Sequence, residues 1–297
     1  MKSLFNVTSW ELKRARLDRS LWMMLPAVFV FCLAMTWFKH VWARPVVDGR
    51  VGETINILGT TQIGLPYLVI ELLLTLVALV FPFVATDGLA RDYRQRLHEL
   101  TMATAIPTWA YVWGRYLASL LINLLLTVCL LAAVLLAGGL LRSFAGYPML
   151  STVLLLAIWG VAIIPAATVL TSVSFVLGAF WPRLANGLKL AGLVGWLVLV
   201  FMVDAWDRGT TWFTYWNPTS YGIVRVNLDS LVAQYQTAVL GVPDPSQHAA
   251  LALKLQQAPV SLTPWIAPHA VLVLLSLTLV AATALLFSRF RPVVAQS

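Results

Sequence analysis

The sequence predicts an all-α membrane protein with six transmembrane helices. Of its 297 residues, 60% are hydrophobic and only 11% are charged, whereas soluble domains carry about 25% charged residues. The apolar residues are gathered into runs of about twenty, the length that a helix needs to cross the hydrocarbon core of a bilayer. These observations argue strongly against a soluble domain, and we expect a single transmembrane domain over 1–297.

Six apolar runs define the predicted spans. They cover about 21–38, 63–86, 116–141, 150–180, 187–203 and 267–287. The basic residues before the first run are typical of a signal peptide, but no small-residue cleavage site follows, so we expect an uncleaved anchor. The fourth run is the longest, and Pro165 within it predicts a kink. Cys32 and Cys129 both lie inside apolar runs, so we expect no disulfide framework.

The distribution of Lys and Arg predicts that both termini are cytoplasmic. With the N-terminus inside, the cytoplasmic segments carry about 13 of the 20 Lys and Arg residues, as the excess of these residues in cytoplasmic loops requires. The net charge of +8 then indicates contact with anionic lipid rather than binding of nucleic acid. The segment 87–116 is therefore expected inside. The segment 204–266 is expected outside, with a short helix over about 220–240.

No motif in the chain predicts catalysis or a cofactor. The sequence has no G-x-x-x-x-G-K-[ST] loop to cradle the phosphates of a nucleotide, and no G-x-S-x-G turn to present a nucleophilic serine. The histidines are scattered over different segments, which does not supply the ligands of a metal site; they are His40, His98, His248 and His269. We expect that the chain is not an enzyme by itself and binds no metal.

The cytoplasmic stretch 91–107 is the most informative part of the sequence. It leaves the membrane as a charged run, continues as a short helix-prone segment and stops at Pro107. Leu97, Leu100 and Thr101 share one face of such a helix, at spacings of three and four. This shape suits docking into a groove of another protein. The alternative is a solvated loop that lies at the membrane interface.

Segment 91–118 resembles the cytoplasmic coupling segment of type-2 ABC exporter permeases. The matching positions are Glu99, Leu100, Pro107, Trp109, Tyr111, Gly114 and Arg115. The start of the chain, 1–20 with Trp10-Glu11-Leu12-Lys13-Arg14, resembles the interfacial elbow helix of the same family. The turn Gly178–Arg183 and the stretch Trp216-Asn217-Pro218 also fit. The resemblance covers nearly the whole chain, but only segment 91–118 is specific.

This resemblance implies a permease that depends on other chains for energy. In the family, two six-helix subunits pair and each rests on a separate ATPase subunit, which binds ATP and Mg; the permease itself holds no cofactor. The resemblance assigns the contact with the ATPase to Leu97, Glu99, Leu100, Thr101, Met102 and Pro107. It implies export of a hydrophobic or amphipathic substrate across the cytoplasmic membrane of a prokaryote, with membrane lipid and a second copy or a sister permease as partners.

Glu71 is the one ionisable residue that we place well inside a span. An intramembrane carboxylate is costly and therefore marks a functional site by default, so Glu71 is expected to line a central pathway with Tyr67 and Thr75, four residues to either side. The alternative is a protonated or interface-directed side chain that only serves packing. Asn123, in the third span, is expected to make a helix-packing hydrogen bond.

Two other functions remain open from the sequence. The chain could be a proton-coupled carrier that uses Glu71, although a single intramembrane carboxylate and the lack of an internal repeat count against this. It could also be a membrane scaffold that recruits an ATPase without moving a substrate. The exporter requires ATP hydrolysis that depends on 91–107, the carrier requires a proton gradient, and the scaffold requires neither.

Overall fold

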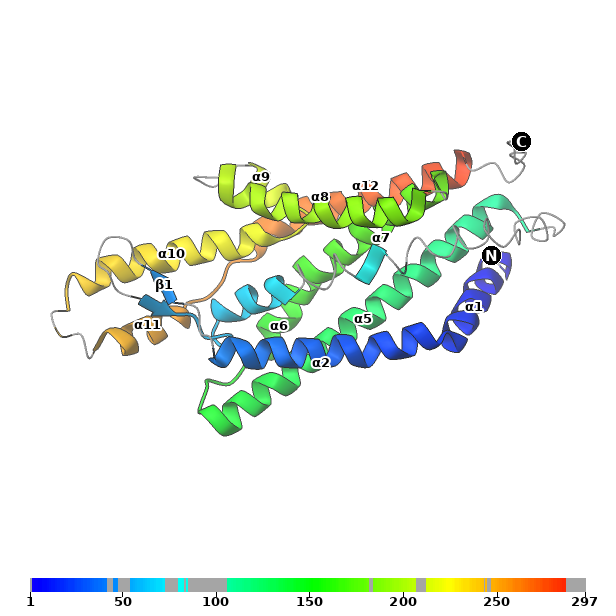
Figure 1. Cartoon of the computed structure of the whole chain (residues 1–297). Coiled ribbons are helices and arrows are strands. Elements are labelled where there is room, and N and C mark those ends of the chain that lie inside the picture. Colours follow the sequence, from blue (N-terminus) through cyan, green and yellow to red (C-terminus); the bar gives the residue numbers. More distant parts are fainter. Residues whose placement is uncertain are drawn as a thin grey trace.

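The computed structural model is predominantly helical (Figure 1), and it describes residues 2–41, 45–47, 54–72, 80–82, 84, 106–181, 184–206, 212–242, 244 and 247–286. The helices are α1 (Lys2–Leu17), α2 (Arg19–Val41), α5 (Thr108–Ala145), α6 (Thr152–Ile158), the π-helix η1 (Trp159–Ile163), α7 (Ile164–Phe180), α8 (Ala185–Trp206), α9 (Trp212–Trp216), α10 (Tyr221–Val239), α11 (His248–Gln256) and α12 (Thr263–Leu286). Residues 64–72 are also helical. A short antiparallel hairpin joins β1 (Pro45–Val47) to β2 (Thr54–Asn56), with Pro45 opposite Asn56.

Among the described residues, four helices are long and apolar enough to cross a membrane, so the chain is a helical membrane protein with several spans. They are Leu21–Phe38, Thr108–Ala145, Thr152–Phe180 and Thr263–Leu286, and they coincide with the expected first, third, fourth and sixth spans. Helix α8 overlaps the expected fifth span and contains a shorter apolar stretch, Leu190–Leu199. Part of the expected second span lies outside the described residues, so the count of six stays a prediction.

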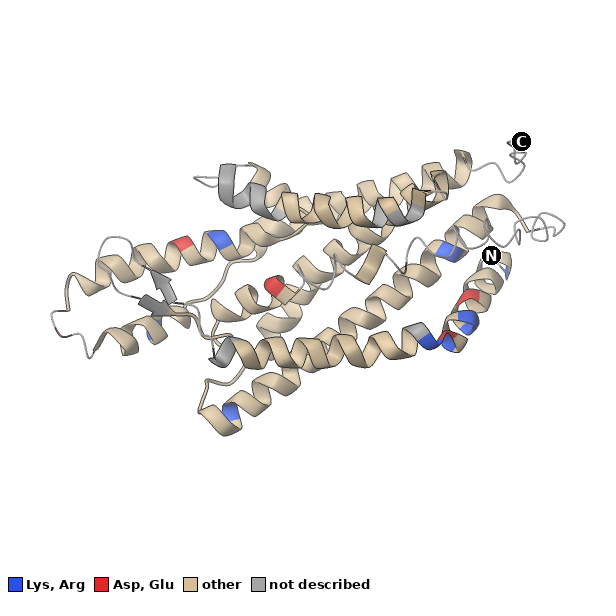
Figure 2. Ribbon diagram, viewed as in Figure 1, with Lys and Arg blue, Asp and Glu red and all other residues tan. Residues whose placement is uncertain are grey.

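The long helices run beside one another, and the remaining elements gather at the two ends of the bundle. Helix α1 lies at an angle across one end, where α5 begins and α12 ends, whereas α10, α11 and the hairpin lie at the opposite end (Figure 1). The charged residues that the structure describes follow the same division, with most of them at the two ends and few between (Figure 2). A middle with few charges suits the hydrocarbon layer, where a charged side chain is costly.

Two helices begin earlier than the sequence predicted. Helix α5 begins at Thr108 and not at Tyr116, because Pro107 is extended, with φ −68° and ψ 146°, and serves as the N-cap. The aromatic approach to the third span is therefore its first two helical turns. Helix α12 begins at Thr263, so Pro268 lies inside it rather than at its start. Pro268 is the sixth residue of the helix, so it has no N–H for the carbonyl four residues back, and its ring crowds that carbonyl.

The kink predicted at Pro165 takes the form of a π-helical turn. The turn η1 precedes Pro165, and the Ile164 N–H bonds to the Trp159 carbonyl five residues back. Pro165 has no N–H for the Val161 carbonyl, its partner in a regular α-helix. That carbonyl instead accepts a hydrogen bond from Nδ1 of His269 at 2.6 Å. His269, buried in α12, therefore joins the last span to the interruption in the fourth.

We expect His269→Leu to lower the free energy of unfolding by about 1–3 kcal/mol, because it removes this donor from a buried carbonyl. Adding Pro165→Ala should recover part of the loss, since an alanine at position 165 brings a backbone N–H for the Val161 carbonyl. Thermal unfolding of the purified protein in detergent, for both single variants and the double variant, measures the effect. Purely additive losses in the double variant would contradict the role given to His269.

Candidate functional site

The junction between α1 and the start of α5 is the candidate functional site, because it directly follows segment 91–107. Leu97, Glu99, Leu100, Thr101 and Met102 lie outside the described residues, whereas Pro107 is described. The Pro107 carbonyl accepts a hydrogen bond from the Tyr111 N–H at 3.1 Å. A regular helix of 38 residues therefore begins immediately after the residue at which the segment ends.

Helix α1 approaches the backbone of α5 closely at Gly114. A Cβ atom added at Gly114 would lie 2.7 Å from Cβ of Val7, far closer than two carbon atoms tolerate. The Thr8 hydroxyl lies 3.0 Å from the Leu4 carbonyl and 3.3 Å from the Gly114 carbonyl, so it can donate to either. Only glycine permits this contact, which explains the residue at this position.

An ion pair at Arg115, the residue after Gly114, also holds α1 against α5. Nη2 of Arg115 lies 3.0 Å from Oε1 of Glu11, and the two side chains are only 3% and 13% exposed. The guanidinium group also lies 4.9 Å from the centre of the Tyr111 ring, within the range of a cation–π interaction. Because a buried ion that loses its partner is strongly destabilising, α1 and α5 are held together as one unit.

Next to this contact, a cluster of aromatic side chains packs α5 against α7. The hydroxyl groups of Tyr116 and Ser172 are hydrogen-bonded at 2.8 Å. The Tyr116 ring packs edge-on against both Trp113 and Phe175, at 5.6 Å between ring centres in each case. Val280 of α12 belongs to the same buried cluster. Three of the candidate spans, which contain α5, α7 and α12, thus meet next to the junction with α1.

Asn123 is part of the packing between two spans, as the sequence predicts. Its Nδ2 donates to Oγ1 of Thr171 at 2.8 Å, and both side chains are fully buried. The Thr171 hydroxyl in turn donates to the Ala167 carbonyl of its own helix. A hydrogen bond of this kind between spans contributes about 0.6 kcal/mol on average, so its main effect is to fix the register of α5 against α7.

Tyr67 and Glu71 share one face of the helical segment 64–72. They are the only residues of 65–72 that are half-buried, and the other six are buried. The spacing of four places both side chains on the less covered side, as the sequence predicts. Thr75 lies outside the described residues. Tyr67 also packs against the main hydrophobic core, and a pathway along this face remains a proposal.

At the opposite end of the bundle, Gln256 holds the loop that leads into the segment 64–72. Its Oε1 accepts a hydrogen bond from the Leu58 N–H at 2.9 Å and lies 3.1 Å from the Thr61 hydroxyl, which can donate to it or to the Leu58 carbonyl at 2.6 Å. Its Nε2 donates to the Asn56 carbonyl at 2.6 Å, and its own carbonyl accepts from the Ile63 N–H. One side chain of α11, 1% exposed, thus joins parts of the chain about 200 residues apart.

A second buried hydrogen-bond network is centred on Asn217, in the stretch Trp216-Asn217-Pro218 named in the sequence analysis. Its Nδ2 donates to the Leu199 carbonyl of α8 at 2.8 Å, and its Oδ1 accepts from the backbone and the hydroxyl of Thr219. Ser220 follows with a positive φ of 61°, which a non-glycine residue adopts only where the surroundings impose it. This hydrogen-bond network holds the start of α10 against α8.

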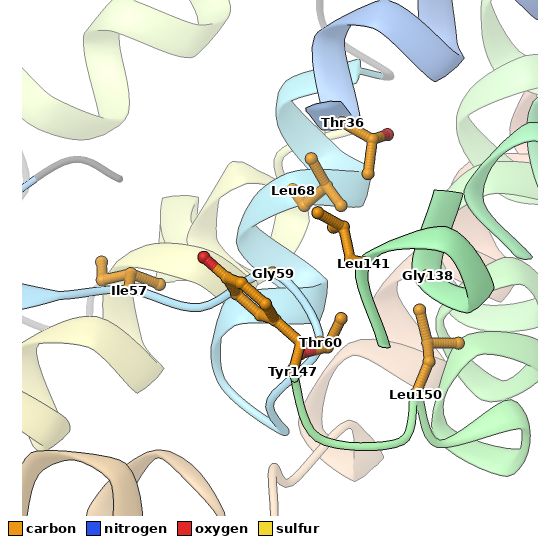
Figure 3. A pocket seen from close by; sticks show the side chains of 9 residues that line it. All are labelled: Thr36, Ile57, Gly59, Thr60, Leu68, Gly138, Leu141, Tyr147 and Leu150. Carbon is orange, nitrogen blue, oxygen red and sulfur yellow. The ribbon is translucent and has the colours of Figure 1, made fainter. Parts of the chain in front are cut away.

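A small pocket lies between α2, the end of α5 and the loops at 57–60 and 147–150 (Figure 3). Its volume is about 10 Å³, the size of a single water molecule. Thr60 Oγ1 is buried there and has no hydrogen-bond partner among the described residues. Burial raises the pKa of the Tyr147 hydroxyl, so that group stays protonated. The space fits one structural water and is too small for a substrate.

Comparison with known proteins adds no family assignment: no protein-family model and no curated protein match this chain. Within the described part of the chain, no group of three His, Cys, Asp or Glu residues is placed to hold a metal ion.

Sequence reasoning missed three of the contacts that build these sites. It named Glu11 and Arg115 in separate motifs but did not pair them, although Glu11 is the only acidic residue among the four cations of α1. It placed His269 among scattered histidines without a partner. It gave no role to Gln256, and nothing in the local sequence distinguishes Gln256 from its neighbour Gln257.

Proposed function

We propose that this chain is the transmembrane subunit of an ATP-binding-cassette exporter, which extrudes a hydrophobic or amphipathic substrate with ATP hydrolysed by separate ATPase subunits. The observation that carries the proposal is the fixed joint between α1 and α5, with the ion pair of Glu11 and Arg115 at 3.0 Å. It lies eight residues after Pro107, where the segment that resembles a coupling helix ends.

The proposed mechanism uses this joint to transmit movement. Residues Leu97, Glu99, Leu100, Thr101 and Met102 contact the ATPase, and a displacement of that segment enters α5 at Pro107. Helix α5 moves together with α1 and displaces α7 through the contacts of Tyr116 and Asn123. Transmission requires that these contacts differ between two states of the permease. The subunit has six spans and cytoplasmic termini, pairs with a second permease, and places 204–266 on the outer side.

Copurification tests the proposal. The full chain is purified in mild detergent from its native host, and mass spectrometry identifies the proteins that accompany it. We expect an ATPase subunit, and we expect the double variant Glu99→Ala with Leu100→Ala to lose it. Lys254→Ala, an exposed substitution on α11 at the far end of the bundle, is the control and should retain it. Recovery of the permease alone, correctly folded, would contradict the exporter.

Glu71 provides a separate prediction about the pathway. If Glu71, Tyr67 and Thr75 line it, Glu71→Gln and Glu71→Ala should reduce both transport and the stimulation of ATP hydrolysis by substrate. The basal ATPase rate should stay near that of the unmodified complex, because Glu71 is not among the residues that the resemblance assigns to the ATPase contact. Transport and stimulated ATPase activity that are intact in both variants would remove Glu71 from the pathway.

The half-buried face of Glu71 also favours a second candidate, a proton-coupled carrier. An intramembrane carboxylate that takes up and releases a proton is a common device in such proteins. The two candidates differ in reconstituted vesicles. A carrier transports when an imposed proton gradient is present and ATP is absent, whereas the exporter requires ATP and its partner subunit. A membrane scaffold would bind the ATPase and transport under neither condition.

A further inference from the structure

A cavity of about 370 Å³ lies between α1 and the start of α5. The described part of its wall is almost entirely carbon, and it is formed by Asn6, Val7, Trp10, Ile106, Tyr111 and Arg115. This volume falls within the range of about 300–1,000 Å³ that is typical of small-molecule sites. The cavity is thus large enough for part of a ligand, and its apolar walls select a hydrocarbon over a polar group.

Among the described residues that line the cavity, Arg115 is the one ionic group, and its charge is already neutralised. Arg115 is paired with Glu11, and its guanidinium group also faces the rings of Tyr111 and Trp10. An anionic headgroup inside the cavity would have to compete with a buried carboxylate for the same cation. The cavity itself therefore suits an uncharged chain, and a headgroup must lie outside it.

The cations that could receive a headgroup lie on the adjoining surface of α1. Asn6, Trp10, Lys13 and Leu17 follow one another at spacings of four, three and four, so they form one stripe of the helix. The first two line the cavity, and all four are exposed. Arg16 and Lys2 are exposed beside this stripe.

The side chain of Trp10 stands at the boundary between the cavity and this basic surface. It is 51% exposed, and the Arg14 guanidinium lies 5.6 Å from its ring centre. Indole groups favour the interface between headgroups and hydrocarbon. Trp10 therefore adjoins both an apolar cavity and a basic surface, and a phospholipid likewise places its hydrocarbon next to a charged headgroup.

We propose that α1 and the start of α5 form a binding site for an anionic phospholipid. One acyl chain occupies the cavity, and the phosphate group lies against Lys13 and Arg16. A peptide segment fits less well, because each buried backbone N–H and carbonyl requires a hydrogen-bond partner and the walls offer few polar atoms. The site is independent of the proposed exporter function, since it involves neither an ATPase nor a pathway.

Native mass spectrometry of the full chain in detergent tests the site. The protein is titrated with palmitoyl-oleoyl phosphatidylglycerol, with phosphatidylcholine of the same chains, and with glycerol phosphate. We expect phosphatidylglycerol to bind tightest. Glycerol phosphate should not bind, because it has no acyl chain. Lys13→Gln with Arg16→Gln should weaken phosphatidylglycerol about thirtyfold, the effect of about two surface cations. Lys254→Gln, an exposed cation on α11, should leave binding unchanged.

A variant in the wall of the cavity tests the contact with the acyl chain separately from the contact with the headgroup. Asn6→Trp places an indole at the mouth of the cavity and should weaken phosphatidylglycerol about tenfold, because apolar contact with the chain is lost. Gln234→Trp, at an exposed position of α10, is the matched control. Dihexanoyl phosphatidylglycerol has acyl chains too short to fill the cavity, so it should bind the unmodified protein more weakly than the long-chain lipid does. This comparison tests the contact with the acyl chain without any substitution.

Three results would overturn the site. The first is equal binding of phosphatidylglycerol and phosphatidylcholine, which would remove the headgroup contact. The second is full binding by Asn6→Trp together with full binding of the dihexanoyl lipid, which would leave only attraction to a basic surface. The third is binding of glycerol phosphate as tight as that of the lipid, which would identify a phosphate site instead.

Discussion

Glu11→Leu is expected to lower the free energy of unfolding by about 3–5 kcal/mol, the range for a buried ion pair that loses one partner. The reason is that Arg115, 3% exposed, keeps its charge but loses the carboxylate 3.0 Å away. The loss should appear in thermal unfolding of the detergent-purified protein. If the joint transmits movement, the variant should also lose substrate-stimulated ATPase activity while it still copurifies with the ATPase.

The matched control is the ion pair on α10. Nε of Arg225 lies 2.9 Å from Oδ2 of Asp229, but these side chains are 31% and 63% exposed. Asp229→Leu should therefore cost less than about 1 kcal/mol, as exposed pairs do. The double variant Glu11→Leu with Arg115→Met should recover most of the stability, because replacing both buried ions by apolar groups is often neutral. A double variant that is as unstable as the sum of its two parts would contradict this account.

Gln256→Met is expected to destabilise the far end of the bundle by about 2–5 kcal/mol, since buried polar groups that lose a partner cost about 1–3 kcal/mol each. The substitution keeps the length of the side chain but removes its contacts with the backbone of Leu58 and Asn56 and with the Thr61 hydroxyl. Hydrogen exchange of the amides in 56–64 should rise, and thermal unfolding should shift to lower temperature.

Gln257→Met is the control, one residue further along the chain. Gln257 is exposed at the end of α11, so its replacement should change stability by less than about 0.5 kcal/mol. Amides of α1 and of the first turns of α5 should exchange at the same rate in both variants, because this part of the chain lies at the opposite end of the bundle (Figure 1). Equal effects of the two substitutions would show that the contacts of Gln256 do not hold the loop.

Periodicity and hydropathy predicted the membrane helices because both are properties of continuous sequence. A run of about twenty apolar residues has few alternatives to a spanning helix, and four such runs are helices that meet this criterion. The short helix expected over 220–240 is α10, Tyr221–Val239. The ends of the helices were less well predicted, because Pro107 and Pro264 act at the boundary, where a proline can begin a helix as well as end one.

The sequence by itself therefore determined the class of the protein, the position of most of its membrane helices and the face shared by Tyr67 and Glu71. Only the tertiary structure decided how the ends of the bundle are held. It paired Glu11 with Arg115, His269 with Val161 and Gln256 with the loop at 56–63. Such contacts join residues about 100 to 200 positions apart, and no local pattern encodes which buried polar group meets which.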